Sequence, residues 1–122
     1  MLDPEFTHVT VMTPRGIGAI ASCLVLGPDA FRAVNSCFSP RRETPLSVED
    51  QGRVLFGDWQ GAEELLVCVR DEKSIEVHCH GGLAAVTSII TSLVAAGCKQ
   101  CDSEQLHELL ESDPLVRLAG RL

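Results

Sequence analysis

The sequence has little positive charge and few aromatic rings. Lysine and arginine total 10 against 17 acidic residues, which gives a net charge of −7, and the chain has one Trp, four Phe and no Tyr. Binding to nucleic acids depends on cationic side chains that contact phosphates and on aromatic rings that stack on bases. We therefore expect no direct contact between this chain and RNA or DNA.

Long apolar runs are also missing. The longest stretch of apolar character, residues 83–96, contains four Ser and Thr residues and is shorter than the ~20 residues that cross a bilayer. The first five residues include Asp3 and Glu5 and do not resemble the basic start of a secretory signal. These features predict no membrane contact and a cytoplasmic location, where the six cysteines are expected to be reduced.

The sequence has no motif for nucleotide hydrolysis. It contains no Gly-Lys-Ser or Gly-Lys-Thr, so nothing in it would cradle or neutralise a triphosphate. Gly16 and Gly18 form a glycine loop that lacks the third glycine of a dinucleotide-binding fingerprint. This loop is either a tight turn or a place where a ligand meets bare backbone. Because no nucleophile and base are paired in the sequence, we expect no enzymatic activity from the chain alone.

The pattern of apolar residues predicts one α+β domain over residues 1–122. A chain of this length holds a single hydrophobic core. Runs rich in β-formers predict strands over residues 6–12, 20–26, 52–59, 63–69 and 74–80, with a short edge strand at 99–102. Helical spacing predicts helices over residues 30–37 and 83–96 and from Ser103 onwards, and 39–49 is expected to be a loop. The result is a mixed sheet of about five or six strands with two or three helices.

The segment from Ser74 to Gly82 is the most informative part of the sequence. Because side chains alternate between the two faces of a strand, Glu76, His78 and His80 share one face. The paired glycines at 81 and 82 then allow a sharp turn into the next helix, since glycine takes positive φ without steric cost.

Three interpretations of the two histidines remain open at this stage. They are structural side chains, ligands of a metal together with Cys98 and Cys101, or contacts for a small molecule. Their separation by a single residue departs from the spacing of three to five residues in a zinc finger.

The same segment carries a resemblance to a known family. Glu76-Val77-His78-Cys79-His80-Gly81-Gly82, followed by an apolar helix, resembles the signature of the N-terminal domain of the tRNA-modification GTPases called MnmE or TrmE. Residues 13–20, Thr-Pro-Arg-Gly-Ile-Gly-Ala-Ile, and residues 27–30, Gly-Pro-Asp-Ala, resemble two further blocks of that family. The resemblance covers about residues 7–97, and residues 103–122 are expected to form a divergent C-terminal helix.

The resemblance implies a TrmE N-terminal-domain-like fold that forms a homodimer and binds a one-carbon tetrahydrofolate, in the 5-formyl or the 5,10-methylene form. It also implies a part in modifying the wobble uridine of tRNA, together with a GTPase domain in the same chain or in another. The cofactor-binding positions that it implies here are Gly16, Gly18, Glu72, His78, His80 and Gly81.

Two cations of the resembling family have no counterpart in this sequence. The family's arginine in the second strand corresponds to Leu24, and residues 101–106 replace the start of a segment that carries a lysine. Each lost charge-assisted bond to a folate carboxylate is worth roughly 1.5–3 kcal/mol. Two alternatives therefore stay open: a non-catalytic scaffold domain without folate, or a small metal-binding module. The apolar content of 45% favours a face that a partner covers, and a homodimer would cover it.

Overall fold

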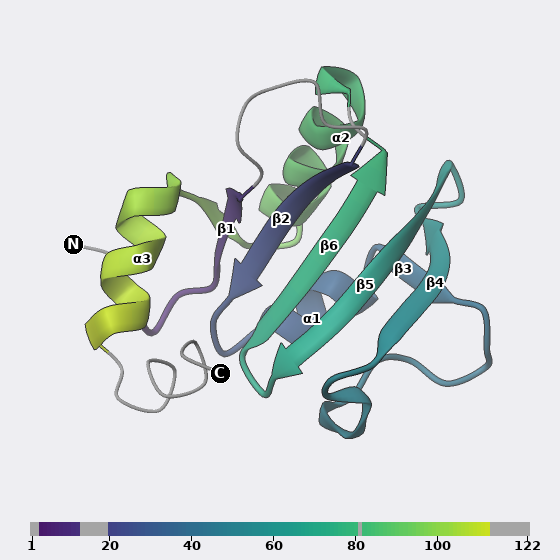
Figure 1. Cartoon of the computed structure of the whole chain (residues 1–122), viewed down its shortest axis with the longest axis horizontal. Helices are drawn as coiled ribbons and strands as arrows, with labels where there is room; N and C mark the ends of the chain where they lie inside the picture. Colours follow the sequence, from purple (N-terminus) through teal and green to yellow (C-terminus); the bar gives the residue numbers. More distant parts are fainter. Residues whose placement is uncertain (1–2, 13–19, 81, 113–122) are drawn as a thin grey trace.

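Seven strands form a single sheet with helices on both of its faces (Figure 1). The structure, a computed structural model, describes residues 3–12, 20–80 and 82–112. The described helices are α1 (Ala30–Asn35), α2 (Leu83–Ala95) and α3 (Ser103–Ser112), and one short 3-10 helix, η1, covers Val48–Asp50. The described strands are β1 (His8–Val11), β2 (Ile20–Leu26), β3 (Phe38–Pro40), β4 (Val54–Trp59), β5 (Glu63–Asp71), β6 (Ser74–His80) and β7 (Lys99–Gln100).

The sheet is mixed, which confirms the predicted α+β class. Its strand order is β3-β4-β5-β6-β2-β1-β7, and the pairs are antiparallel except for β1 with β7, which is parallel. β5 joins β4 through a tight turn in which Gln60 and Gly61 both have positive φ. Such a turn matches the right-handed twist of the strands on either side of it.

The strand count is higher than the five or six that we predicted, because β3 was expected to lie in a loop. Phe38 pairs with Trp59, and its side chain is buried in the core. Pro40 has no N–H to donate, which an edge strand tolerates. A Cβ on Gly57 would lie 2.3 Å from the Ser39 carbonyl oxygen, so the close approach of β3 to β4 requires glycine there. Nothing local in residues 38–40 indicates this long-range pairing.

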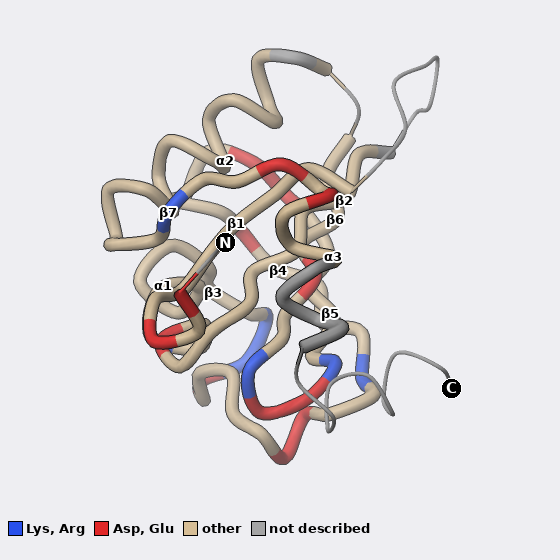
Figure 2. Tube along the Cα trace, turned by 90° about the vertical axis from the view of Figure 1, so that its left-hand side faces the viewer, with Lys and Arg blue, Asp and Glu red and all other residues tan. Residues whose placement is uncertain are grey.

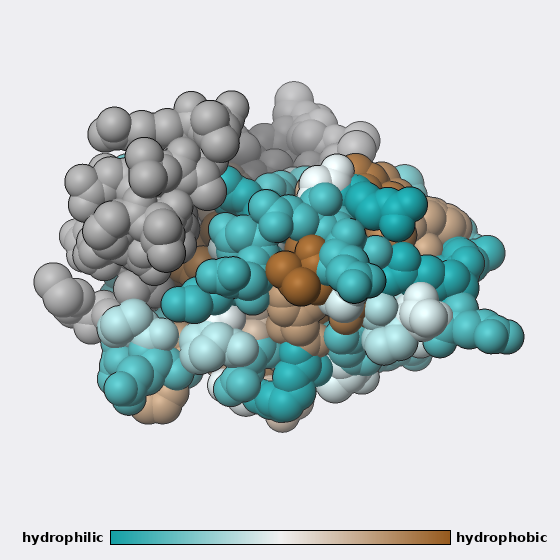
Figure 3. Space-filling model, turned by 90° about the horizontal axis from the view of Figure 1, so that it is seen from below, coloured by the Kyte–Doolittle hydropathy of each residue, from teal (hydrophilic) through white to brown (hydrophobic). Residues whose placement is uncertain are grey.

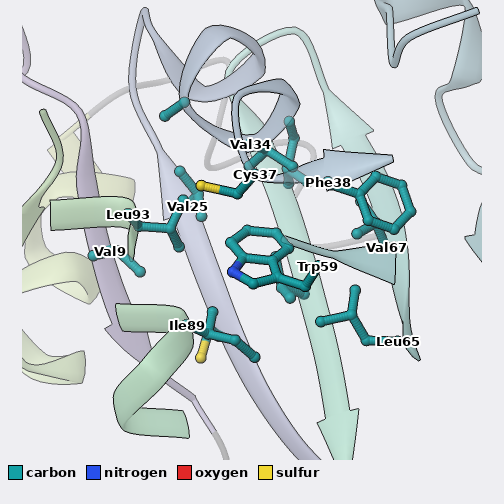
Figure 4. Close-up of a cluster of buried hydrophobic side chains, with 14 of the residues drawn as sticks. Val9, Val25, Val34, Cys37, Phe38, Trp59, Leu65, Val67, Ile89 and Leu93 are labelled. Carbon is teal, nitrogen blue, oxygen red and sulfur yellow. The ribbon is translucent and has the colours of Figure 1, made fainter. Parts of the chain in front are cut away.

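The main core lies between the sheet and the helices α1 and α2. Alternate residues of β5, such as Leu65 and Val67, point into it and share it with Val34 of α1 and Leu93 of α2 (Figure 4). Trp59 lies in this cluster, 2% exposed. Its indole N–H donates to Ser92 Oγ at 2.8 Å, and that hydroxyl donates to the Ile89 carbonyl at 2.8 Å. The one polar atom of this large ring is therefore satisfied inside the core.

Helix α3 covers the other face of the sheet, at β1 and β2. Leu106 packs there with Leu24, Leu26 and Cys101 in a second, smaller cluster. His8 is also buried on this side, and burial together with the nearby Lys99 lowers the pKa of its ring. No helix among the described residues is long and apolar enough to cross a membrane.

Candidate functional site

A row of polar side chains crosses the sheet on the face opposite α1 and α2. The antiparallel register places Ser22 of β2 directly beside His78 of β6. The Ser22 hydroxyl lies 2.7 Å from His78 Nδ1, and His78 Nε2 lies 3.1 Å from a carboxylate oxygen of Glu76. The other oxygen of Glu76 is 3.2 Å from Arg70 Nε on β5. Four side chains from three neighbouring strands thus form one continuous polar row.

The predicted sharing of a face by Glu76 and His78 is confirmed. Both ring nitrogens of His78 meet side chains. With a proton on Nε2, the ring donates to Glu76 and accepts from the Ser22 hydroxyl. Tertiary pairing of β2 with β6 brings Ser22 to this position, so reasoning from the sequence missed Ser22 and Arg70.

The row has the residue types of a Ser-His-Glu catalytic triad but not the surroundings of one. A triad needs unpaired N–H groups that stabilise the developing oxyanion. Ser22 lies in the middle of β2, which pairs with β1 on one side and β6 on the other. The backbone of Ser22 therefore lies within the hydrogen-bonded sheet, between β1 and β6.

The predicted cofactor-binding positions do not all come together. His80 ends β6 on the same face as His78 and is exposed. Glu72 is exposed in the turn between β5 and β6, beyond the other end of that strand. The six residue steps from Ser74 to His80 span about 20 Å of extended chain, so one pterin ring cannot touch both Glu72 and His80. Gly16, Gly18 and Gly81 lie outside the described residues.

The position that matches the family's arginine is closed. Leu24 is fully buried beneath α3 and packs against Leu106. A guanidinium at this position would have no room to reach a ligand while α3 remains in place.

The two cysteines of the CxxC lie in different cores. Cys98 belongs to the main cluster with Leu93, and Cys101 belongs to the smaller cluster with Leu106. Burial raises the pKa of each thiol to about 11. The two thiols lie in separate clusters and do not converge with the histidines. Within residues 3–12, 20–80 and 82–112, no three His, Cys, Asp or Glu side chains converge in a metal-like group.

The five arginines that the structure describes all have a carboxylate within 4 Å. Arg42 and Asp50 form the tightest pair, with two bonds of 2.6 and 2.9 Å to a carboxylate that is nearly buried. This pairing lowers the pKa of Asp50 to about 2. The others are Arg32 with Asp29, Arg41 with Asp58 and Glu64, Arg53 with Asp50, and Arg70 with Glu76. In the lower part of Figure 2, basic positions accordingly lie beside acidic ones. The described arginines therefore form no unpaired cluster there that could bind the phosphate backbone of a nucleic acid.

Comparison with proteins of known function points to one family. The chain is 32% identical over 108 residues to the tRNA modification GTPase MnmE of Carboxydothermus hydrogenoformans, an alignment that covers 78% of this chain and 23% of that protein. It is 32% identical over 105 residues to MnmE of Porphyromonas gingivalis, covering 76% of this chain and 22% of the relative. MnmE of Oceanobacillus iheyensis is 29% identical over 109 residues, covering 81% and 24%. The chain is a divergent homologue of the MnmE N-terminal domain.

The resemblance to MnmE seen in the sequence is thereby confirmed. The chain spans about a quarter of the length of the MnmE proteins that it matches. No protein-family profile matches it. Relative to the pattern expected of an MnmE-type domain, it keeps the histidine signature, with Glu76 and His78 half-buried on β6, and has the buried Leu24 where a cation is expected.

Proposed function

We propose that this chain is the assembly domain of a tRNA-modification GTPase and that it holds two copies of the protein together. The observation that carries the proposal is the similarity to MnmE over 108 residues, 78% of the chain. The relatives are named as tRNA modification GTPases, whereas the sequence has no Gly-Lys-Ser or Gly-Lys-Thr. GTP hydrolysis, and the tRNA chemistry at the wobble uridine that the resemblance implies, would belong to a GTPase domain in the same chain or in a partner.

The surface supports an assembly role better than a catalytic one. Seen from below, most of it is hydrophilic, with separate apolar groups between the polar ones (Figure 3). The large exposed apolar side chains include Val54, Phe56 and Leu66, which lie on two neighbouring strands. Apolar side chains gathered on one face of a small protein mark a site of association.

The assembly role predicts that the purified chain is a dimer. In sedimentation equilibrium at micromolar concentration we expect a mass of twice the 13.2 kDa of one chain. Dilution should shift the distribution towards the monomer, because association depends on concentration. A single species of one-chain mass at every concentration would contradict the role.

Binding of a one-carbon tetrahydrofolate is the second candidate function. The observation that favours it is the row of Ser22, His78 and Glu76, whose strand ends next to the paired glycines of the family signature. A reduced folate held there would meet both hydrogen-bond donors and hydrogen-bond acceptors. It would lack the arginine that the family places at the position of Leu24.

We expect titration calorimetry with 5-formyltetrahydrofolate to separate the two predicted parts of this site. If heat is seen, His78→Ala should abolish it and Glu72→Ala should leave it unchanged. Glu72 lies in the β5–β6 turn beyond Ser74, and Ser74 is four residue steps, about 13 Å, from His78 along β6. Loss of heat in Glu72→Ala alone would contradict this placement. An absence of heat from the unaltered chain at ~100 μM ligand would exclude a dissociation constant below roughly 100 μM and leave the assembly role.

A further inference from the structure

A histidine ring is buried beneath α3 on the outer face of the sheet. His8 of β1 is 2% exposed and pairs with Leu26 of β2, which packs with Leu106 of α3 in the smaller cluster. The next residue, Val9, belongs to the main core on the inner face, so the side chain of His8 lies on the side that α3 covers (Figure 1). Helix α3 therefore rests on a group that can take up a proton.

One ring nitrogen of His8 is buried without a hydrogen-bond partner in the part of the chain that the structure describes. That atom is Nδ1. The charged imidazolium carries an N–H on both nitrogens, and each N–H needs an acceptor. Protonation of the ring while α3 is in place would therefore leave a charged donor unsatisfied inside the protein, which is costly.

A positive charge stands next to this ring. Lys99 of β7 pairs with His8 in parallel register, and its ammonium lies 3.7 Å from the centre of the Phe6 ring, a cation–π contact. Burial and Lys99 lower the pKa of His8 from its ordinary value of 6.5. The Phe6 backbone and Asp3 raise this pKa, but by less. Acid therefore has to charge the ring against its surroundings.

The other described groups around His8 place no buried charge beside it. The side chains of β2 there are Leu24 and Leu26. The Cys101 thiol, which follows β7, stays protonated at neutral pH because burial raises its pKa to about 11. The ionisable groups nearby that are exposed or half-buried are Asp3 and Glu5 before β1, Asp102, Glu104 and His107 at α3, and Glu76 and His78 on β6. Of the described groups buried beneath α3, His8 is the one that titrates between pH 5 and 8.

The start of α3 is held together by local bonds. The Gln105 N–H donates to Asp102 Oδ1 at 2.7 Å, and the Asp102 N–H donates to Gln105 Oε1 at 3.2 Å. Among the side chains of residues 103–107, Leu106 alone is buried against the sheet. The reciprocal bonds do not involve the sheet, so this end of α3 can move off it as a unit.

We infer that α3 is a cover that acid releases: it docks on β1 and β2 while His8 is neutral and leaves the sheet when that ring is protonated. Once α3 has left, the ring reaches water, where both N–H groups find acceptors. The movement uncovers Leu24 and Leu26 together with Leu106, so mild acid exposes an apolar strip that is closed at neutral pH. This regulation is separate from the proposed assembly role.

The difference in pKa between the two forms sets the direction and the size of the effect. The released ring has the ordinary pKa of 6.5 and the docked ring a lower one, so the released form binds more protons between the two values. Docking is therefore strongest above pH 6.5 and weakens as the pH falls below it. From pH 8 to pH 5 the ratio of released to docked α3 should rise by up to about 30-fold, the limit for a docked ring that takes up no proton at pH 5.

Hydrogen exchange of the 122-residue chain, expressed as protection factors, measures this release. A helix of ten residues is marginal in water by itself, so the amides of released α3 should exchange. From pH 8 to pH 5 we expect the protection of amides 106–112 to fall by up to about 30-fold while β6 keeps its protection. Unchanged protection of α3 would overturn the proposal, and so would an equal fall in β6, which indicates global unfolding in acid.

Replacement of the histidine tests which group takes up the proton. His8→Gln removes the titrating ring and keeps a side chain that can form hydrogen bonds, so the fall in α3 protection should disappear. His107→Gln is the matched control, because His107 is an exposed histidine on α3 itself, and this variant should keep the fall. A fall that persists in His8→Gln, or one that is lost in His107→Gln, would overturn the proposal.

Lys99→Gln tests the same switch without a change in the core. Without the ammonium the docked ring takes up a proton more readily, so the fall in α3 protection should be smaller than in the unaltered chain. Lys99 is exposed, so this variant should fold even where His8→Gln fails to. A fall in Lys99→Gln that equals or exceeds that of the unaltered chain would overturn the proposal.

Discussion

Trp59→Ala should lower the free energy of unfolding by about 4 kcal/mol, since removal of a large buried aromatic side chain leaves a cavity. The side chain is 2% exposed and lies where β4, α1 and α2 meet. The change also removes the donor to Ser92 Oγ. Small domains have a total stability of about 5–15 kcal/mol, so this variant should be largely unfolded at modest urea concentrations.

The measurement is urea unfolding followed by far-UV circular dichroism, because Trp59 is the only Trp and its fluorescence disappears with it. Trp59→Phe is the matched control: it keeps an aromatic ring and loses the hydrogen bond to Ser92. We expect it to be intermediate in stability. Val48→Ala, at an exposed position, should change stability by less than about 0.5 kcal/mol. A loss below about 1.5 kcal/mol in Trp59→Ala would contradict the central position of this ring in the core.

Gly27→Ala should cost about 3 kcal/mol or more, because a methyl group has no space there and the backbone conformation is unfavourable for alanine. Gly27 has φ +149°, and a Cβ built on it would lie 2.4 Å from Thr7 Cα. Its N–H donates to the Lys73 carbonyl at 2.9 Å, which ties the end of β2 to the β5–β6 turn. Thr7 in turn accepts from the Asp29 N–H at 2.8 Å, so neither segment is free to move away.

Gly61→Ala is the control for the effect of positive φ alone. Gly61 has φ +71°, and a Cβ there would have nothing within 4 Å. Alanine in this left-handed conformation costs roughly 1–2 kcal/mol. Urea unfolding of the two variants side by side measures the part that steric contact contributes. Equal losses for both would show that the close packing of Gly27 against Thr7 has no energetic consequence.

The elements that could be predicted from the sequence are those whose pattern follows from one-sided burial. In β6, the alternation of Ile75 and Val77 with Glu76 and His78 reflects a strand with one face in the core, and the predicted bounds of 74–80 match it. The prediction of β2 at 20–26 was also confirmed. Helix α1 ends at Asn35 rather than at the predicted residue 37, because the chain turns there to begin β3.

The candidate site was predicted less completely, because its members come from different strands. The shared face of Glu76 and His78 follows from the two-residue period of one strand. The partners Ser22 and Arg70 depend on the register of β6 with β2 and with β5. Their own strands gave no signal that they would meet a histidine, since a lone Ser or Arg in an alternating strand is common.

The sequence by itself determined the α+β class, the histidine strand with its glycine turn, the absence of a nucleotide-hydrolysis motif and the relationship to MnmE. Each of these depends on local periodicity or on the order of residues along the chain. Tertiary structure alone decided the pairing of β3 with β4, the division of Cys98 and Cys101 between two cores, the burial of Leu24 under α3 and the exposure of the β4–β5 face. The physical reason is that these features depend on which surfaces pack against one another between segments far apart in the sequence. The local residue pattern of one segment does not indicate which distant segment it will pack against.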